Sequence, residues 1–182
     1  MKEFDVWFEA LATQALPGGV AAAAIAAAMG AALVIKVADT TLRHRSLSLP
    51  EQQQLEALLD LARQSSPHLL HLAGEDERAY RRVLQTRESA EDVDQRRQAW
   101  RQATEVPLRI AEASQALLLR LDPLADTCWP PVLTDLRAGR RLLAVGLGAG
   151  VEAAEENLRI WGEGVAALPL RARLEHLRRE DL

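Results

Sequence analysis

A long stretch without charge dominates the sequence and limits how the chain can fold. Between the turn Pro17-Gly18-Gly19 and Lys36, residues 20–35 carry no charged side chain and are mostly alanine. Alanine loses no side-chain entropy in a helix, so the stretch predicts a helix that is apolar on every side. Such a helix has to be buried. The sequence therefore predicts an all-α fold, a helical bundle around a buried Ala/Gly-rich central helix.

The same stretch is too short for a membrane span. Its sixteen residues cover about 24 Å at about 1.5 Å each, whereas the hydrocarbon core of a bilayer is about 30 Å thick. Lys36 and Asp39 follow it, and the start of the chain lacks the positively charged region of a signal peptide. We therefore expect a soluble protein without a membrane partner.

Composition narrows the class of protein further. The 182 residues suit one domain, 1–182, and the formal net charge of −4 gives no basic footprint for nucleic acid. Cys128 is the only cysteine, so no disulfide can form within the chain, as suits a cytoplasmic protein. We expect Cys128 to be a small buried hydrophobic residue and not a nucleophile.

Helical periodicity continues along the rest of the chain, and no segment shows the alternation of a strand, so no sheet is expected. Helices are predicted at about residues 2–14, 20–42, 50–64, 67–87, 95–120, 132–162 and 168–179. Pro67 is expected to begin a new helix or to kink a continuing one, and Pro107 is expected to kink its helix or to reset its register. Residues 88–94 are acidic and predict a loop.

Two stripes of small residues suggest how the helices pack. Ala22, Ala26 and Gly30 lie at successive i+4 positions, and so do Gly146, Gly150 and Ala154. We expect the two helices that carry them to cross closely, within the subunit or across a dimer. The glycine-rich run at 145–150 also resembles a dinucleotide-binding loop, but a helical pattern and not a strand precedes it.

Few residues suggest chemistry by themselves. His68, His71 and Glu75 lie on one helical face and could bind a metal, although a solvated face is the favoured interpretation. Asp76 lies in mid-helix, where aspartate is a poor helix former. It is either a solvated charge or an inward-facing acid or base, and the residues alone favour the first.

The order of the motifs resembles the cyclodeaminase/cyclohydrolase family of folate one-carbon enzymes. This family includes the cyclodeaminase half of formiminotransferase-cyclodeaminase and the bacterial methenyltetrahydrofolate cyclohydrolases. The matching residues are Pro17-Gly18-Gly19 before the alanine-rich helix, Asp76 with Ala79 and Tyr80, Ala103 with Val106-Pro107-Leu108, Thr134-Asp135, and Asn157-Leu158.

The resemblance implies an all-helical homodimer that binds a reduced folate near its interface, with no metal or other cofactor. It implies interconversion of 5-formimino- or 10-formyl-tetrahydrofolate with 5,10-methenyltetrahydrofolate, with Asp76 as the catalytic acid or base. The substrate-binding residues it implies are Pro17, Gly18, Gly19, Tyr80, Asp135 and Asn157.

The family pattern is not complete in this chain. Val20 and Ala21 stand where the family has Gly and Ser, and Ala153 stands where it has Asn. Deaminase and hydrolase both stay open, as does a non-catalytic helical dimer of the same fold acting as a partner or regulatory protein. A cationic rim for the glutamate tail of a folate could come from Arg43, Arg45, Arg137, Arg140 and Arg141.

Overall fold

The structure, a computed structural model, describes residues 2–88, 93–162 and 164–179. In chain order its helices are α1 (Lys2–Thr13), α2 (Gly19–His44), α3 (Leu49–Glu88), α4 (Val93–Leu118), α5 (Asp122–Thr127), the 3-10 turn Pro130–Val132, α6 (Leu133–Trp161), the 3-10 turn Val165–Ala167 and α7 (Leu168–Arg179). No strand occurs among these residues. The prediction of an all-α fold is confirmed.

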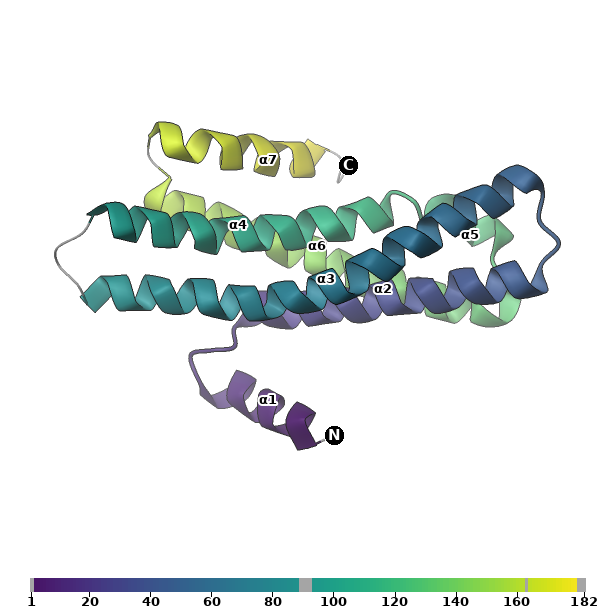
Figure 1. The fold of residues 1–182 in the computed structure, drawn as a ribbon, viewed down its shortest axis with the longest axis horizontal. Coiled ribbons are helices and arrows are strands. Elements are labelled where there is room, and N and C mark those ends of the chain that lie inside the picture. The colour runs from purple at the N-terminus through teal and green to yellow at the C-terminus, as the bar shows by residue number, and fades with distance from the viewer. Residues whose placement is uncertain (1, 89–92, 163, 180–182) are drawn as a thin grey trace.

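Four long helices form the bundle. Figure 1 shows α2, α3, α4 and α6 side by side, while α7 lies along one side and α1 stands away from the bundle. Successive neighbours pack in the order α2, α3, α4, α6 and back to α2. Because α2 begins well inside the bundle, only α3, α4 and α6 continue to the end near the α3–α4 connection (Figure 1).

The central helix packs into the bundle, although less completely than predicted. Eleven residues of α2 are buried, among them Ala24, Ala31 and Val34. The prediction of burial on every side is wrong, however, because Met29 is 46 % exposed. By length and composition α2 could cross a membrane, and half of its most apolar window is buried inside the bundle.

Glycines bring α6 against two neighbours at once. A Cβ added at Gly30 would lie 2.8 Å from the Gly139 oxygen, and one at Gly146 would lie 2.6 Å from the Ala27 Cβ. One at Gly150 would lie 2.5 Å from the Pro107 oxygen on α4. The close crossing of α2 and α6 is thus confirmed.

The residues predicted for this crossing are only partly right. Ala22 and Ala26 are half-buried, and the close contact uses Ala23 and Ala27 on the adjacent face of α2. Gly150 lies against α4 and not against α2. Periodicity identifies a smooth stripe, but it does not fix which neighbour each residue meets.

Both internal prolines lie inside continuous helices. Helix α3 runs through Pro67 without a break, and α4 runs through Pro107. Of the two expectations at Pro67, the new helix is wrong, and a helix that continues through the proline is what the structure has. The predicted loop at 88–94 lies partly outside the described residues, and the short helix α5 was not predicted.

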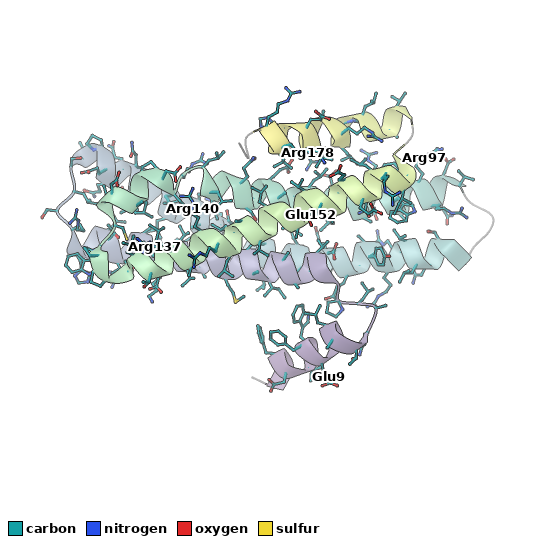
Figure 2. The ribbon with its side chains drawn as sticks, turned by 180° about the vertical axis from the view of Figure 1, so that it is seen from behind. Glu9, Arg97, Arg137, Arg140, Glu152 and Arg178 are labelled. Atoms are coloured by element: carbon teal, nitrogen blue, oxygen red, sulfur yellow. The ribbon has the colours of Figure 1, made fainter. Side chains whose placement is uncertain are left out.

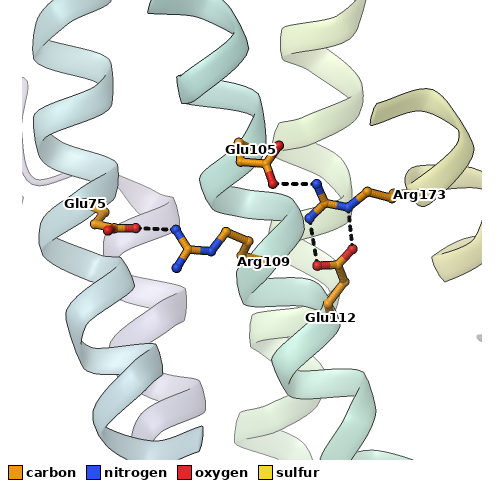
Figure 3. A network of polar contacts seen from close by, with 5 residues as sticks. All are labelled: Glu75, Glu105, Arg109, Glu112 and Arg173. Carbon is orange, nitrogen blue, oxygen red and sulfur yellow. Dashed lines mark hydrogen bonds and ion pairs between the residues drawn. The ribbon is translucent and has the colours of Figure 1, made fainter. Parts of the chain in front are cut away.

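Helix α7 is held against α4 by apolar side chains and one arginine. Leu170, Leu174 and Leu177 are buried. Arg173 donates two hydrogen bonds to the Glu112 carboxylate at 2.6 and 2.8 Å and also pairs with Glu105 (Figure 3). This ionic network fixes α7 along the bundle.

Candidate functional site

The start of α2 and Asp76 lie at the same level of the bundle. The Ser66 hydroxyl donates a hydrogen bond of 3.2 Å to the Ala28 carbonyl, which sets the register between antiparallel α3 and α2. Asp76 follows Ser66 by ten residues, and Gly18 precedes Ala28 by ten. Because both helices rise about 1.5 Å per residue, Asp76 comes level with the Pro17-Gly18-Gly19 turn.

Asp76 is a buried carboxyl without a charge partner. It is 9 % exposed, none of the described residues forms a hydrogen bond or an ion pair with its carboxylate, and its oxygens are not fully closed off from solvent. Burial, with a smaller contribution from the neighbouring Glu77 charge, raises the pKa of Asp76 from 3.8 to about 6. The carboxyl can therefore accept or release a proton close to neutral pH.

The raised pKa of Asp76 predicts a pH-dependent stability. Between about pH 4 and pH 6 the folded protein holds a proton that the unfolded chain has released. The free energy of unfolding should therefore fall as the pH rises through this window, by about 3 kcal/mol, and then stay level. Urea unfolding of the wild type and of Asp76→Asn at several pH values measures the difference. Identical pH profiles would contradict the prediction.

The turn before α2 uses glycine where packing does not demand it. Pro17 is buried, and Gly18 is the N-cap residue with φ −108° and ψ −174°, a conformation open to any residue. A Cβ at Gly18 or Gly19 would meet nothing within 4 Å. Neither backbone strain nor a steric clash explains these two glycines, unlike Gly146 and Gly150.

Asn157 has a structural task that the sequence did not reveal. Pro107 has no N–H, so the Ala103 carbonyl four residues earlier lacks its usual helical donor. The Asn157 side-chain nitrogen on α6 donates to that carbonyl at 2.8 Å. The nitrogen of the Asn157 amide is thus already hydrogen-bonded to α4. The Pro107 pattern could have predicted a free carbonyl, but not which side chain serves it.

The pairing of Asn157 with the proline can be tested by substitution. Asn157→Ala should lower the free energy of unfolding by about 1–3 kcal/mol, because the Ala103 carbonyl loses its donor. In a Pro107→Ala background a backbone N–H returns, so the same substitution should cost less. Chemical denaturation of the four proteins gives the coupling energy. Equal costs in the two backgrounds would show that Asn157 does not act through this carbonyl.

Tyr80 lies at the same end of the bundle as Asp76. It is half-buried and packs against the main core, one helical turn beyond Asp76 on α3. Arg82 on α3 donates a hydrogen bond to Gln102 on α4 at 2.6 Å, so this part of α3 lies beside Ala103. Asn157 bonds to Ala103, and Tyr80 is therefore at the same height along the bundle as Asn157. The structure therefore brings Asp76, Tyr80, Asn157 and the turn to one end of the bundle.

Asp135 is not brought to this site within one chain. It pairs with Lys36 at 2.7 Å, at the end of α6 opposite to Asn157. The 22 residues between Asp135 and Asn157 correspond to about 33 Å along a continuous helix. Its predicted contact with substrate is therefore not assembled by a single subunit.

The other residues singled out for chemistry have structural surroundings. Glu75 pairs with Arg109 at 2.6 Å and with His71 at 3.2 Å. Within the described ranges no group of three or more side chains could hold a metal ion. Cys128 is buried, as expected, and burial raises the pKa of its thiol, which disfavours a nucleophile. The 145–150 run lies within α6.

The basic residues predicted to line a cationic rim lie far from Asp76. Figure 2 shows Arg137 and Arg140 on the first half of α6, whereas the Asp76 site lies near Asn157 on its second half. Arg43 pairs with Asp39 and Arg140 pairs with Asp122, so both charges are matched. This rim does not serve the Asp76 end of one subunit.

Comparison with known proteins agrees with the fold. The model of the formiminotransferase-cyclodeaminase family matches residues 4–175. The structure is similar to the crystal structure of formiminotetrahydrofolate cyclodeaminase from Thermotoga maritima, with a TM-score of 0.85 and 22 % identity, over 99 % of this chain and 88 % of that one. At this identity the similarity establishes the fold. No curated protein matches the chain.

Proposed function

Because the chain belongs to the formiminotransferase-cyclodeaminase family, we propose that it is an enzyme of folate one-carbon metabolism. The reaction is the interconversion of 5-formimino- or 10-formyl-tetrahydrofolate with 5,10-methenyltetrahydrofolate. Both directions pass through a tetrahedral carbon that bridges the two folate nitrogens. Both therefore depend on a group that moves protons at this carbon.

The observation that supports this proposal best is the state of Asp76. Its pKa of about 6 lets the carboxyl donate or accept a proton at neutral pH. In the deaminase reaction its acid form protonates the departing nitrogen, and ammonia leaves as the methenyl bridge forms. In the hydrolase reaction its carboxylate removes a proton from the water that attacks the methenyl carbon. Neither route transfers electrons, and the proposal needs no metal or redox cofactor.

The remaining residues at this end of the bundle would hold the folate. Gly18 and Gly19 leave backbone N–H groups accessible without a Cβ in the way. The Asn157 side-chain oxygen remains able to accept a hydrogen bond while its nitrogen serves Ala103. Pro17 fixes the turn, and Tyr80 offers a ring and a hydroxyl beside the site. Asp135 has no role in the site proposed for one subunit.

A second candidate function is a non-catalytic dimer of the same fold, acting as a partner or regulatory protein. It is favoured by Val20, Ala21 and Ala153, which replace two polar side chains and one glycine of the family pattern. Turnover separates the two candidates. Purified protein is mixed with 5-formimino-tetrahydrofolate or methenyltetrahydrofolate, and the methenyl chromophore is followed. Folate binding without turnover would favour the second candidate, and neither binding nor turnover would exclude the first.

We propose further that the protein is a cytoplasmic homodimer, and its exposed apolar side chains support the dimer. Phe4 and Phe8 on α1 and Val145 on α6 are each about half exposed, and Met29 on α2 adds to them. Helix α6 is basic in its first half, at Arg137, and acidic further on, at Glu152 (Figure 2). Two copies of α6 in antiparallel contact would therefore have complementary charges. Sedimentation equilibrium measures the mass of the assembly.

A further inference from the structure

A polar groove runs along the seam between α3 and α4. One cavity of about 280 Å³ lies there. Its lining consists of Glu75, Arg78, Ala79, Arg82, Gln102, Glu105, Val106 and Arg109. Asp76, Tyr80, Asn157 and the Pro17-Gly18-Gly19 turn are not part of this lining, although Ala79 and Val106 of the family motifs are. The groove therefore offers a binding surface that the proposed reaction does not use.

The acidic residues of the groove already have partners. Glu75 pairs with Arg109, and Glu105 pairs with Arg173 of α7, as Figure 3 shows. Arg78 and Arg82 have no acidic partner among the residues that the structure describes. Arg82 instead donates to the side-chain oxygen of Gln102 at 2.6 Å. Two positive charges in the groove are thus left without a counter-charge.

The two arginines are arranged as a pair. They lie at positions i and i+4 on α3, so their attachment points are about 6 Å apart on one face. Arg78 lies back over Gly74, where a Cβ would come within 3.3 Å of its guanidinium. Because Gly74 has no side chain, the Arg78 guanidinium has room to lie there.

From this arrangement we propose that the groove binds the two carboxylates of a terminal glutamate. A guanidinium binds a carboxylate through two parallel hydrogen bonds, and two separated guanidinium groups match two separated carboxylates. A compact phosphate could engage only part of the span between the two arginines, whereas a dicarboxylate can reach both.

The seam continues beyond this cavity in a manner that suits a longer ligand. A second cavity of about 310 Å³ shares Arg82 and Gln102 and adds Gln98 and Thr86. Amide and hydroxyl groups match the peptide bonds of a chain of glutamyl units. Two sources of this chemistry are possible: a free dicarboxylate, or the glutamate tail of a folate. Only the second rests on the proposed function.

Titration calorimetry tests the proposal with defined probes. L-glutamate and glutarate are titrated into the full chain, with acetate and inorganic phosphate as comparison ligands. We expect saturable binding of the dicarboxylates, and binding at least tenfold weaker for acetate and phosphate. Arg78→Gln with Arg82→Gln should abolish it. Arg81→Gln, which removes an exposed arginine of α3 outside both cavities, should leave it unchanged.

A second set of titrations identifies the source of the glutamyl group. Reduced folate with one glutamate, with three glutamates, and reduced pteroate without glutamate are compared. A gain in affinity with each added glutamate that disappears in the double variant assigns the groove to the tail. Binding of glutarate alone assigns it to a free dicarboxylate, even if no folate binds. Absence of arginine-dependent binding in both series overturns the proposal, and folate turnover would stand.

Discussion

Asp76→Asn is expected to lower turnover of the methenyl or formimino folate by about a hundredfold to ten-thousandfold, the usual contribution of a general acid or base. Asparagine has almost the shape of aspartate but cannot exchange a proton. The fold should be intact, because no described residue pairs with the carboxyl. Steady-state kinetics with both substrates, together with circular dichroism, measures the two effects.

The same substitution has a second readout that a purely structural residue would not show. At neutral pH the buried charge of Asp76 is unfavourable, so its replacement by a neutral amide should raise the free energy of unfolding. If the variant gains stability and loses turnover, Asp76 serves activity and not the fold. Full turnover in Asp76→Asn would remove Asp76 from the mechanism, and loss of the fold would show that the residue is structural.

Gly146→Leu is expected to destabilise the bundle by about 3 kcal/mol or more. A Cβ at this position would lie 2.6 Å from both the Ala27 Cβ and the Ser114 hydroxyl, so α6 would have to move away from α2 and α4. Thermal and urea unfolding measure the loss. Wild-type stability would show that the close contact is not essential.

Two alanine variants provide a matched control for this contact. Gly146→Ala adds the clashing Cβ alone and should also lower stability. Gly148→Ala, two residues further on the same helix, meets nothing within 4 Å. It should raise stability by about 0.5–1 kcal/mol, because alanine is the better helix former. If both variants change stability in the same direction, helix propensity and not packing decides the outcome.

The architecture followed from local features of the sequence, and its contacts did not. Alanine and the absence of charge predicted α2, and helical periodicity predicted the long helices around it. Pro67 left two alternatives open, a new helix or a continuing one, and only the structure shows that α3 continues through it. The prediction of Ala22 and Ala26 as contact residues is wrong, because a helix covered with alanine has several smooth faces. The sequence does not say which of them meets α6.

The candidate site was predictable only through resemblance. Polarity in mid-helix made Asp76 unusual, but the residues alone favoured a solvated charge, and burial became visible only in the structure. Asp135 shows the reverse case, since its motif matched although it pairs with Lys36 at the far end of α6. Pairings across the bundle, such as Glu75 with Arg109, depend on register that single helices do not encode.

The hydrogen bond from Asn157 to Ala103 affects how sequences of this kind are to be interpreted. A helix that keeps a proline at position 107 gains from a donor at position 157, whether or not any folate is bound. Asparagine there is consequently a poor diagnostic of catalysis when it accompanies the proline. In a related chain without the proline, an asparagine at this place would be the stronger sign of ligand binding.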